Sequence, residues 1–563
     1  MKSEIFTIDR KFGHMVRTAT QSHVDLKNHY SPQDIEHLSY DEDIGEPGEF
    51  PFTRGVYREM YRNRLWLKSY LVSYTTVAET NKAMKDYVAN GLTDIRFTAD
   101  LPTQCGIDPD HPGAWNSMAC GGIPSYALHV YEEMLEGLPL EDVVYEIGMM
   151  GSSNYLFFHS LLVAMMEKKG LDLNKLHGNS INDPIRAKLV YNSPDFPTVI
   201  DRRIWIDHIE FAIRNTPRWK ACVPNGVDPQ QSGVDVPREL GGCIAVGIAM
   251  VEDLGKRGIS IDDFGPMIFA LDAESDFFET ICKFRAARKL WAKIAKERLG
   301  AKTARAMQLK IGVRTSGLSL TWQKPLNNSA RVALQVLSSV LGGVNSIDAS
   351  GIDEAIGLPS YEARMYNLDT QHIITHEANV PLVADPLGGS YYVEWLTSKI
   401  EQETTTYLQE IDDEGGIFQC LESGRLAKYM EENRVKIERE IEECSRVVVG
   451  VNAFQNEGEE GPINKAIENT AYKVPTVQDR ERIVGEVKQF KASRDLGKLK
   501  PAIRKLYDDT KSGENVSRAV IEAVKVGATI GEVVGTIRSG YGIHYDPFNQ
   551  VEMPEFVREA IGK

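Results

Sequence analysis

The chain has no run of basic residues long enough to serve as a nucleic-acid surface. Its 80 Asp and Glu residues outnumber its 64 Lys and Arg residues, which gives a formal net charge of −16. Nucleic-acid binding depends on Lys and Arg groups that neutralise phosphates, so this balance argues against it. The densest basic segment lies within 277–298, and we interpret it as a solvated helix face rather than a polyanion site.

The sequence also lacks an apolar run of membrane-spanning length, and its first four residues lack the apolar core of a signal peptide. Its seven cysteines are scattered without CxxC spacing, and an odd number without a pattern is typical of a reducing compartment. We therefore expect a cytoplasmic protein that contacts neither membranes nor nucleic acid. No residue is assigned as a metal ligand.

What the chain does contain is a series of short apolar runs that alternate with helix-like segments. With 42% hydrophobic residues in 563 positions, it can bury a large core. The candidate strands are Ile95–Ala99, Val143–Met149, Leu176–Ile181, Arg218–Val223, Met267–Leu271, Leu309–Val313, Val344–Ile347 and Leu382–Ala384. This alternation predicts an α/β protein with a (β/α)8 TIM barrel over 81–400. An N-terminal arm over 1–80 and a helical region over 401–563 are expected to flank the barrel.

Ligands bind such a barrel where its strands end, so the residues that follow each run form the candidate site. They are Thr98–Asp100, Gly151–Asn154, Asn182, Asp183, Asn225–Gln231, Asp272, Arg314–Gly317, Asp348 and Asp385. Each Asp taken alone is more often a helix cap than a catalyst.

The segment 51–70 is rich in arginine and aromatic residues. One interpretation is a packing collar. The other is a groove for an anionic ligand, because arginine binds phosphate bidentately and aromatic rings cover flat groups.

The segment 276–354 organises the rest of the chain. Apolar residues spaced by three and four predict a helix over Phe277–Arg298 with one buried face. A strand then leads into the small hydroxyl residues and glycine of 314–323, which are typical of a ligand-facing loop. Asn327 and Asn328 are suited to cap the next helix, which ends at Gly342 and Gly343.

Several motifs in this region and beyond it resemble one family. They are FFETICKFRAARKLWAKI, TSGLSLTWQKPLNNSARVALQ, DEAIGLP and DPLGGSYYVEWLT, joined by PFTRGVYREMYRNR, ADLPTQCGID and VVVGVNAF. Together they resemble the large, substrate-binding chain of the adenosylcobalamin-dependent acyl-CoA mutases, the methylmalonyl-CoA mutase family. The resemblance covers nearly the whole chain and implies the same barrel.

The resemblance implies radical chemistry. Substrate binding would trigger homolysis of a cobalt–carbon bond, and the barrel would shelter the rearrangement of an acyl-CoA from water and oxygen. The Asp-x-His-x-x-Gly loop that ligates cobalt in this family is not found here. A separate small cobalamin-binding subunit is therefore implied as a partner, in a heterodimer or heterotetramer.

Seven family positions carry over directly to this sequence. Tyr57, Met60 and Arg64 match positions that hold the CoA end, so the segment 1–80 is also expected to contact CoA. Gly121, Gly122, Gly317 and Glu354 match positions that face the adenosyl or corrin part of the cofactor.

The acyl pocket differs from that of methylmalonyl-CoA mutases. Leu71 stands where those enzymes have a tyrosine. Tyr191 replaces the arginine that clamps the substrate carboxylate, and Asp228 replaces the histidine that binds the thioester carbonyl. We take these three as the candidate catalytic positions. Further candidate substrate or CoA contacts are Arg96, Thr98, Asn179, Ile181, Gln231 and Arg314.

Loss of the clamping arginine argues against methylmalonyl-CoA itself, because an unpaired buried carboxylate costs several kcal/mol. The preferred substrate is a bulky aryl- or alkyl-substituted succinyl- or malonyl-CoA, with Arg96 or Arg314 holding its free carboxylate. A mutase of the 2-hydroxyisobutyryl-CoA type is the alternative, although that group carries an acidic residue at the position of Thr98 and keeps the histidine. Methylmalonyl-CoA mutase proper and a catalytically silent paralogue stay open.

Overall fold

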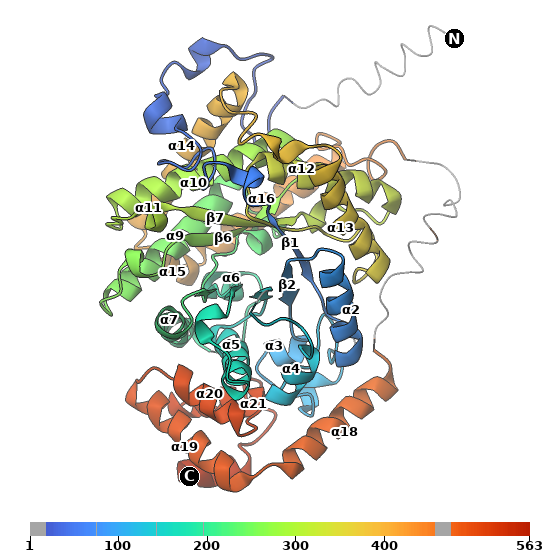
Figure 1. Ribbon diagram of the computed structural model, residues 1–563, viewed down its shortest axis with the longest axis vertical. Coiled ribbons are helices and arrows are strands. Elements are labelled where there is room, and N and C mark those ends of the chain that lie inside the picture. The colour runs from blue at the N-terminus through green and yellow to red at the C-terminus, as the bar shows by residue number, and fades with distance from the viewer. Residues whose placement is uncertain (1–17, 75, 142, 195, 456–464, 466–474) are drawn as a thin grey trace. The chain divides into compact units, whose positions relative to one another are not determined.

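The computed structural model describes residues 18–74, 76–141, 143–194, 196–455, 465 and 475–563. Its elements are labelled in Figure 1. The chain forms two compact units. Unit 1 comprises the described parts of Met1–Trp66, Gly226–Ala249 and Gly265–Tyr472. Unit 2 comprises those of Leu67–Asn225, Met250–Phe264 and Lys473–Lys563.

Eight strands run in the order β5-β4-β3-β2-β1-β8-β7-β6. Unit 2 carries β1 (Leu67–Leu71), β2 (Asp94–Phe97), β3 (Val144–Ile147), β4 (Gly178–Ser180) and β5 (Trp219–Lys220). Unit 1 carries β6 (Met267–Ala273), β7 (Leu309–Thr315) and β8 (Ser346–Asp348). Neighbouring strands within each unit are parallel. This confirms the α/β class and the barrel of (β/α)8 type.

Helices follow the strands in both units. Those of unit 2 are α2 (Val77–Ala89), α3 (Leu101–Gln104), α4 (Leu128–Met134), α5 (Ser152–Lys168), α6 (Pro184–Leu189), α7 (Thr198–Asn215), α18 (Val477–Ser493), α19 (Leu496–Ser512), α20 (Ser517–Lys525), α21 (Ile530–Gly540) and α22 (Glu555–Ile561). Those of unit 1 are α8 (Val227–Gln231), α10 (Phe277–Glu297), α11 (Ala304–Met307), α12 (Asn328–Leu341), α13 (Tyr361–His376), α14 (Tyr391–Asp413), α15 (Ile417–Glu422) and α16 (Arg425–Glu442). Helix α9 (Val236–Gly255) begins in unit 1 and ends in unit 2.

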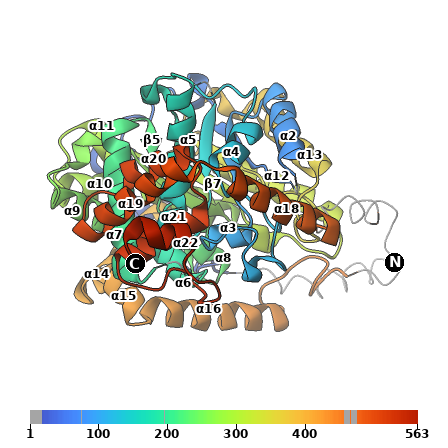
Figure 2. The ribbon, with the colours of Figure 1, turned by 90° about the horizontal axis from the view of Figure 1, so that it is seen from below.

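Within unit 2, the C-terminal helices pack beside α5, as both Figure 1 and Figure 2 show. Helix α5 is buried from Ser152 to Met166, because α7, α20 and α21 cover it. Helix α20 ends at Lys525 and α21 begins at Ile530, with Gly527 between them. Thr529 and Glu532 form the capping box that starts α21.

Helix α10 confirms the predicted span, but its basic face is not solvated as predicted. Lys283, Arg285, Arg288 and Lys289 are at most 2% exposed. Acidic groups from distant segments account for this burial. Glu239 pairs with Lys283, Asp385 and Glu394 pair with Arg285, and Asp43 and Glu401 pair with Lys289.

Three further details differ from the sequence-based prediction. The strand predicted at Leu382–Ala384 is absent, because a 3-10 helix occupies Val380–Leu382 and a segment of bends and turns follows it. The first strand of the sheet is instead β1, within the segment predicted to be an arm. Asn328 does not cap α12, since its side chain bonds the backbone of Thr321 and Ile352. No helix in the described part of the chain is both long and apolar enough to span a bilayer.

Candidate active site

In unit 1, Asp272, Arg314 and Asp348 occupy one row across the ends of three neighbouring strands. Arg314 of β7 is in register with Asp272 of β6 and with Asp348 of β8. Burial alternates along β7, with Leu309, Ile311, Val313 and Thr315 buried and the positions between them partly exposed. The apolar positions pack on α10 and α12, so this row of polar residues lies on the opposite face of the sheet.

Arg314 makes an ion pair with Glu354, which follows β8. The second oxygen of Glu354 accepts from the Gly351 backbone N–H at 3.2 Å. Glu354, Asp348 and Asp228 together raise the pKa of Arg314 above its ordinary value. Three carboxylates thus surround one guanidinium.

Gln231 lies at the end of α8, beside this group. Its Nε2 donates to Asp272 Oδ1 at 2.9 Å. Its Oε1 lies 3.5 Å from where a Cβ on Gly317 would be, and Glu354 Oε1 lies 3.9 Å from the same point. Gln231, Gly317 and Glu354 therefore line one small region.

A buried ion pair lies beside the start of α8. Lys283 Nζ lies 2.6 Å from Glu239 Oε2, and both side chains are fully buried. The other oxygen of Glu239 accepts from the Asp272 N–H at 2.8 Å. A Cβ on Gly226 would lie 2.5 Å from Glu239 Cγ, so only glycine permits this approach where α8 begins.

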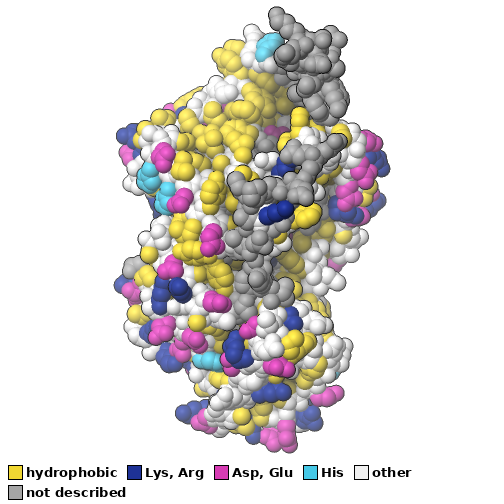
Figure 3. All heavy atoms as spheres, turned by 90° about the vertical axis from the view of Figure 1, so that its right-hand side faces the viewer, with side chains coloured by type: hydrophobic (Ala, Val, Ile, Leu, Met, Phe, Trp, Pro, Cys, Tyr) yellow, Lys and Arg dark blue, Asp and Glu magenta, His cyan; other side chains and the backbone are white. Residues whose placement is uncertain are grey.

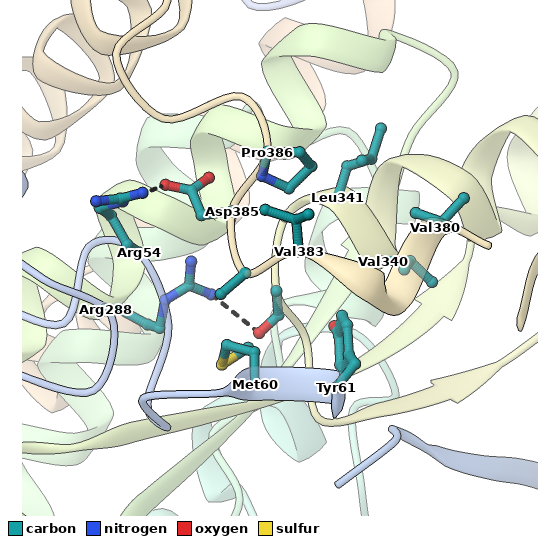
Figure 4. Close-up of a pocket in the computed structure, with 13 residues that line it drawn as sticks. Arg54, Met60, Tyr61, Arg288, Val340, Leu341, Val380, Val383, Asp385 and Pro386 are labelled. Atoms are coloured by element: carbon teal, nitrogen blue, oxygen red, sulfur yellow. Dashed lines mark hydrogen bonds and ion pairs between the residues drawn. The ribbon is translucent and has the colours of Figure 1, made fainter. Parts of the chain in front are cut away.

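The segment that contains Tyr57, Met60 and Arg64 is anchored in unit 1. Arg288 donates to the carbonyls of Phe52, Thr53 and Gly343, and Figure 4 shows the Arg288 side chain beside Met60. Met60 is buried, the Tyr57 ring lies 6.0 Å from Lys310 Nζ, and Arg64 is exposed. Within the described residues, the Arg64 side chain has no ion-pair partner.

In unit 2, a second polar row crosses β1 to β5. Leu71, Arg96, Glu146, Asn179 and Lys220 are successive partners in register. Arg96 forms an ion pair with Glu146, and each side chain is less than 10% exposed. Asn179 is buried, and its Oδ1 accepts no hydrogen bond within the part of the chain that the structure describes.

The other predicted site residues of unit 2 differ from one another in burial and contacts. The Thr98 hydroxyl donates to the Gly148 carbonyl at 2.6 Å, and Ile181 is buried next to Asn182. A Cβ on Gly121 would meet open space, whereas one on Gly122 would lie 2.3 Å from Ala99. Tyr191 is 41% exposed and stacks under Arg186 at 4.9 Å.

The sequence matches the family model for methylmalonyl-CoA mutase over residues 19–543. The chain belongs to the methylmalonyl-CoA mutase family. It is 34% identical to the 2-hydroxyisobutanoyl-CoA mutase large subunit of Aquincola tertiaricarbonis, over 89% of this chain and 88% of that protein. It is 30% identical to human mitochondrial methylmalonyl-CoA mutase, over 93% of this chain and 68% of that protein. The methylmalonyl-CoA mutase of Rhizobium meliloti is also 30% identical, over 97% of this chain and 74% of that protein.

Methylmalonyl-CoA mutases use adenosylcobalamin, and the glycine positions of this family member suit a flat macrocycle. No side chain projects from Gly121 or Gly317, and the space beside Gly121 is open. Glu354 adds a carboxylate next to Gly317. Taken separately, the open space beside Gly121 in unit 2 and the missing side chain at Gly317 in unit 1 are each compatible with the group, and the assignment of these residues to it stays a prediction.

The structure brings together some residues predicted for this mutase-family site and not others. Asp228, Gln231, Arg314, Gly317 and Glu354 share one region of unit 1. In unit 2, Leu71, Arg96 and Asn179 share one row, whereas Tyr191 contacts Arg186 on an exposed loop. The roles given to all of these residues stay predictions.

Sequence reasoning missed the carboxylate of Glu146 and did not foresee the contact made by the carboxylate of Asp272. Glu146 neutralises Arg96, and its signal was a lone acidic residue inside the apolar run Val143–Met149. Asp272 was noted only as a strand-end residue, and its bond to Gln231 depends on a fold that brings positions 41 apart together.

Proposed function

We propose that this chain is the large subunit of an adenosylcobalamin-dependent acyl-CoA mutase whose acyl group carries no free carboxylate. A 2-hydroxyacyl-CoA is the first candidate. The observation that carries this proposal is that both candidate cations, Arg314 and Arg96, are ion-paired to carboxylates of the chain itself.

The energetic argument is strongest for Arg96. Taking it away from Glu146 would leave a buried carboxylate without its cation, which costs about 3–5 kcal/mol. Arg314 is more accessible, but Glu354, Asp348 and Asp228 already face it. A substrate carboxylate would add a fourth negative charge to that group. An ester without a free carboxylate avoids both costs.

One observation keeps the bulky substituted succinyl- or malonyl-CoA as a second candidate. Arg314 retains a buried Nε–H with no acceptor among the described residues. A substrate carboxylate directed at that donor would gain a charge-assisted hydrogen bond. Leu71, partly buried at the end of β1, would face a large apolar acyl group equally well in either case.

The proposed roles of the residues of this chain are as follows. Tyr57, Met60 and Arg64 bind the CoA end, while Thr98, Asn179 and Ile181 contact the rest of the ester. Leu71, Tyr191 and Asp228 shape the acyl pocket, and Gly121, Gly122, Gly317 and Glu354 face the cofactor. When bound, adenosylcobalamin supplies the organic radical that removes and returns a hydrogen atom. The protein's part is to orient the ester and exclude water from it.

A small cobalamin-binding subunit completes the proposed enzyme, as a heterodimer or heterotetramer. The relative from Aquincola tertiaricarbonis is named as a large subunit, which supports an enzyme made of two kinds of chain. Apolar side chains adjoin the predicted cofactor positions, since Leu318 is 60% and Trp322 55% exposed. Further exposed apolar side chains of unit 1 are Leu334, Tyr366, Ile373, Leu382 and Val383, and Figure 3 shows apolar atoms gathered in the upper half of one face. Surfaces of this kind are typical of protein contacts.

The test is an assay of the chain with a family small subunit, adenosylcobalamin and a panel of CoA esters. Isomer formation is measured by mass spectrometry. We expect turnover of 2-hydroxyisobutyryl-CoA or a related hydroxyacyl ester above that of methylmalonyl-CoA. Preference for a dicarboxylic ester would contradict the substrate assignment, and no turnover of any ester would favour the catalytically silent alternative.

A further inference from the structure

Asp272 controls which end of the Gln231 amide faces the site. Its Oδ1 accepts from Gln231 Nε2 at 2.9 Å, which leaves Gln231 Oε1 directed at Gly317. An ionised carboxylate has no hydrogen to donate, so the NH2 end of the amide must face it. The contact therefore fixes the orientation of the amide as well as its position.

The rest of the structure holds Asp272 rigidly. Asp272 is fully buried in β6, and its N–H is fixed by Glu239, which is fixed in turn by Lys283. Gln231 has no such support of its own, because it ends the short helix α8. A side chain that is placed by a rigid partner is pre-organised for binding.

The charged groups around Asp272 come from four elements. Glu239 of α9 and Lys283 of α10 are close enough to act on its charge. Glu274 lies two residues after it along the chain, and Arg314 of β7 is its partner in strand register. Burial, followed by the charge of Glu239, raises the pKa of Asp272 to about 7 against the opposing effect of Lys283. Protonation would turn the carboxyl group into a donor and would remove the constraint on the Gln231 amide.

We propose that Asp272 is a positioning residue that makes Gln231 present its amide oxygen, a hydrogen-bond acceptor, beside Gly317 and Glu354. The ligand class that fits is a group with a hydroxyl or amine donor at that point. Glu354 also presents an oxygen there, so the region accepts hydrogen bonds from two sides. This inference rests on the proposed function for its catalytic consequence, but the contact can be tested without it.

The contact is tested first by urea unfolding of the full chain. Asp272→Asn, Gln231→Leu and the double variant form a cycle, and Glu274→Gln is the matched control, a neighbouring carboxyl group without the bond to Gln231. We expect the double variant to unfold at a lower urea concentration than the wild type, but by clearly less than the sum of the two single shifts. Additive shifts would overturn the proposal, whether or not the protein turns over any ester.

The catalytic consequence is tested in the assembled enzyme with its best ester. We expect Asp272→Asn to lower kcat about tenfold at pH 8 while KM for the ester stays within twofold. The wild type should lose kcat as pH falls through about 7, and Asp272→Asn should lose this dependence while Asp369→Asn, on the exposed face of α13, keeps it. A purely structural role would leave the shape of the pH profile unchanged, and that result would overturn the proposal.

Discussion

Arg314, at the end of β7, and Glu354, in the turn after β8, form an ion pair within unit 1. One was predicted to hold a substrate carboxylate and the other to face the cofactor, and the structure shows that they share one ion pair. A change in either residue therefore alters the electrostatic potential at both the predicted substrate position and the predicted cofactor position. This coupling makes substrate preference and cofactor contact difficult to separate by single substitutions.

Glu354→Gln should make Arg314 more available to an added anion. Because one of the three surrounding carboxylates loses its charge, we expect binding of methylmalonyl-CoA to the chain to strengthen about tenfold, roughly 1.4 kcal/mol. Binding of an ester without a free carboxylate should change little. Calorimetry with both esters measures this difference, and Glu362→Gln on the exposed face of α13 is the control. Equal changes for the two esters would contradict the role given to Arg314.

Tyr191→Arg should raise acceptance of small dicarboxylic esters, because we predict that Tyr191 occupies the position of the arginine that clamps the substrate carboxylate in the family. We expect kcat/KM for methylmalonyl-CoA to rise about tenfold relative to the preferred ester, and Tyr191→Phe to leave the ratio unchanged. Tyr191 stacks against Arg186 on an exposed loop, so an arginine there must also accept a like charge nearby. An unchanged ratio would place Tyr191 outside the acyl pocket.

Folding stability should fall as pH rises from about 4 to about 7. Burial raises the pKa of both Asp272 and Glu274 to about 7, so the folded protein retains protons that the unfolded chain has already released. The free energy of unfolding therefore decreases with pH over this interval. Urea midpoints at pH 5 and pH 8 measure the effect. Asp272→Asn should reduce the difference between them, whereas Asp369→Asn, on the exposed face of α13, should not.

Lys283→Met should destabilise the protein by about 3–5 kcal/mol, because it leaves Glu239 buried without a cation. The double variant Lys283→Met with Glu239→Gln should recover most of that loss, since an amide can still accept from the Asp272 N–H. Urea unfolding measures both. A loss below about 1 kcal/mol in the single variant would mean that Glu239 takes up a proton there instead.

Seven of the eight strands and the span of α10 could be predicted from the sequence because their apolar residues repeat with the period of the element. Strand β1 was missed because Lys68 and Ser69 interrupt its apolar pattern. The burial of the basic residues of α10 could not be predicted, since a Lys or Arg run on a helix normally faces water. Their partners, such as Asp385 and Glu394, lie about a hundred residues away along the chain. The pairing of Arg314 with Glu354 was hidden for the same reason, because the fold decides where the turn after β8 lies relative to β7.

Arg64→Ala should weaken binding of the CoA ester about tenfold, which corresponds to the loss of one charge-assisted hydrogen bond of roughly 1.5 kcal/mol. Arg64 is exposed and unpaired among the described residues, so its removal should not affect folding. The informative comparison is with a pantetheine ester of the same acyl group, which has no phosphate. The KM for the CoA ester should rise in Arg64→Ala while that for the pantetheine ester stays constant, and the difference should shrink at high salt. Arg305→Ala, an equally exposed arginine on α11, is the matched control. If both esters weakened together, Arg64 would be acting on the shape of the 51–64 segment, and the packing-collar interpretation of that segment would be favoured over the anion groove.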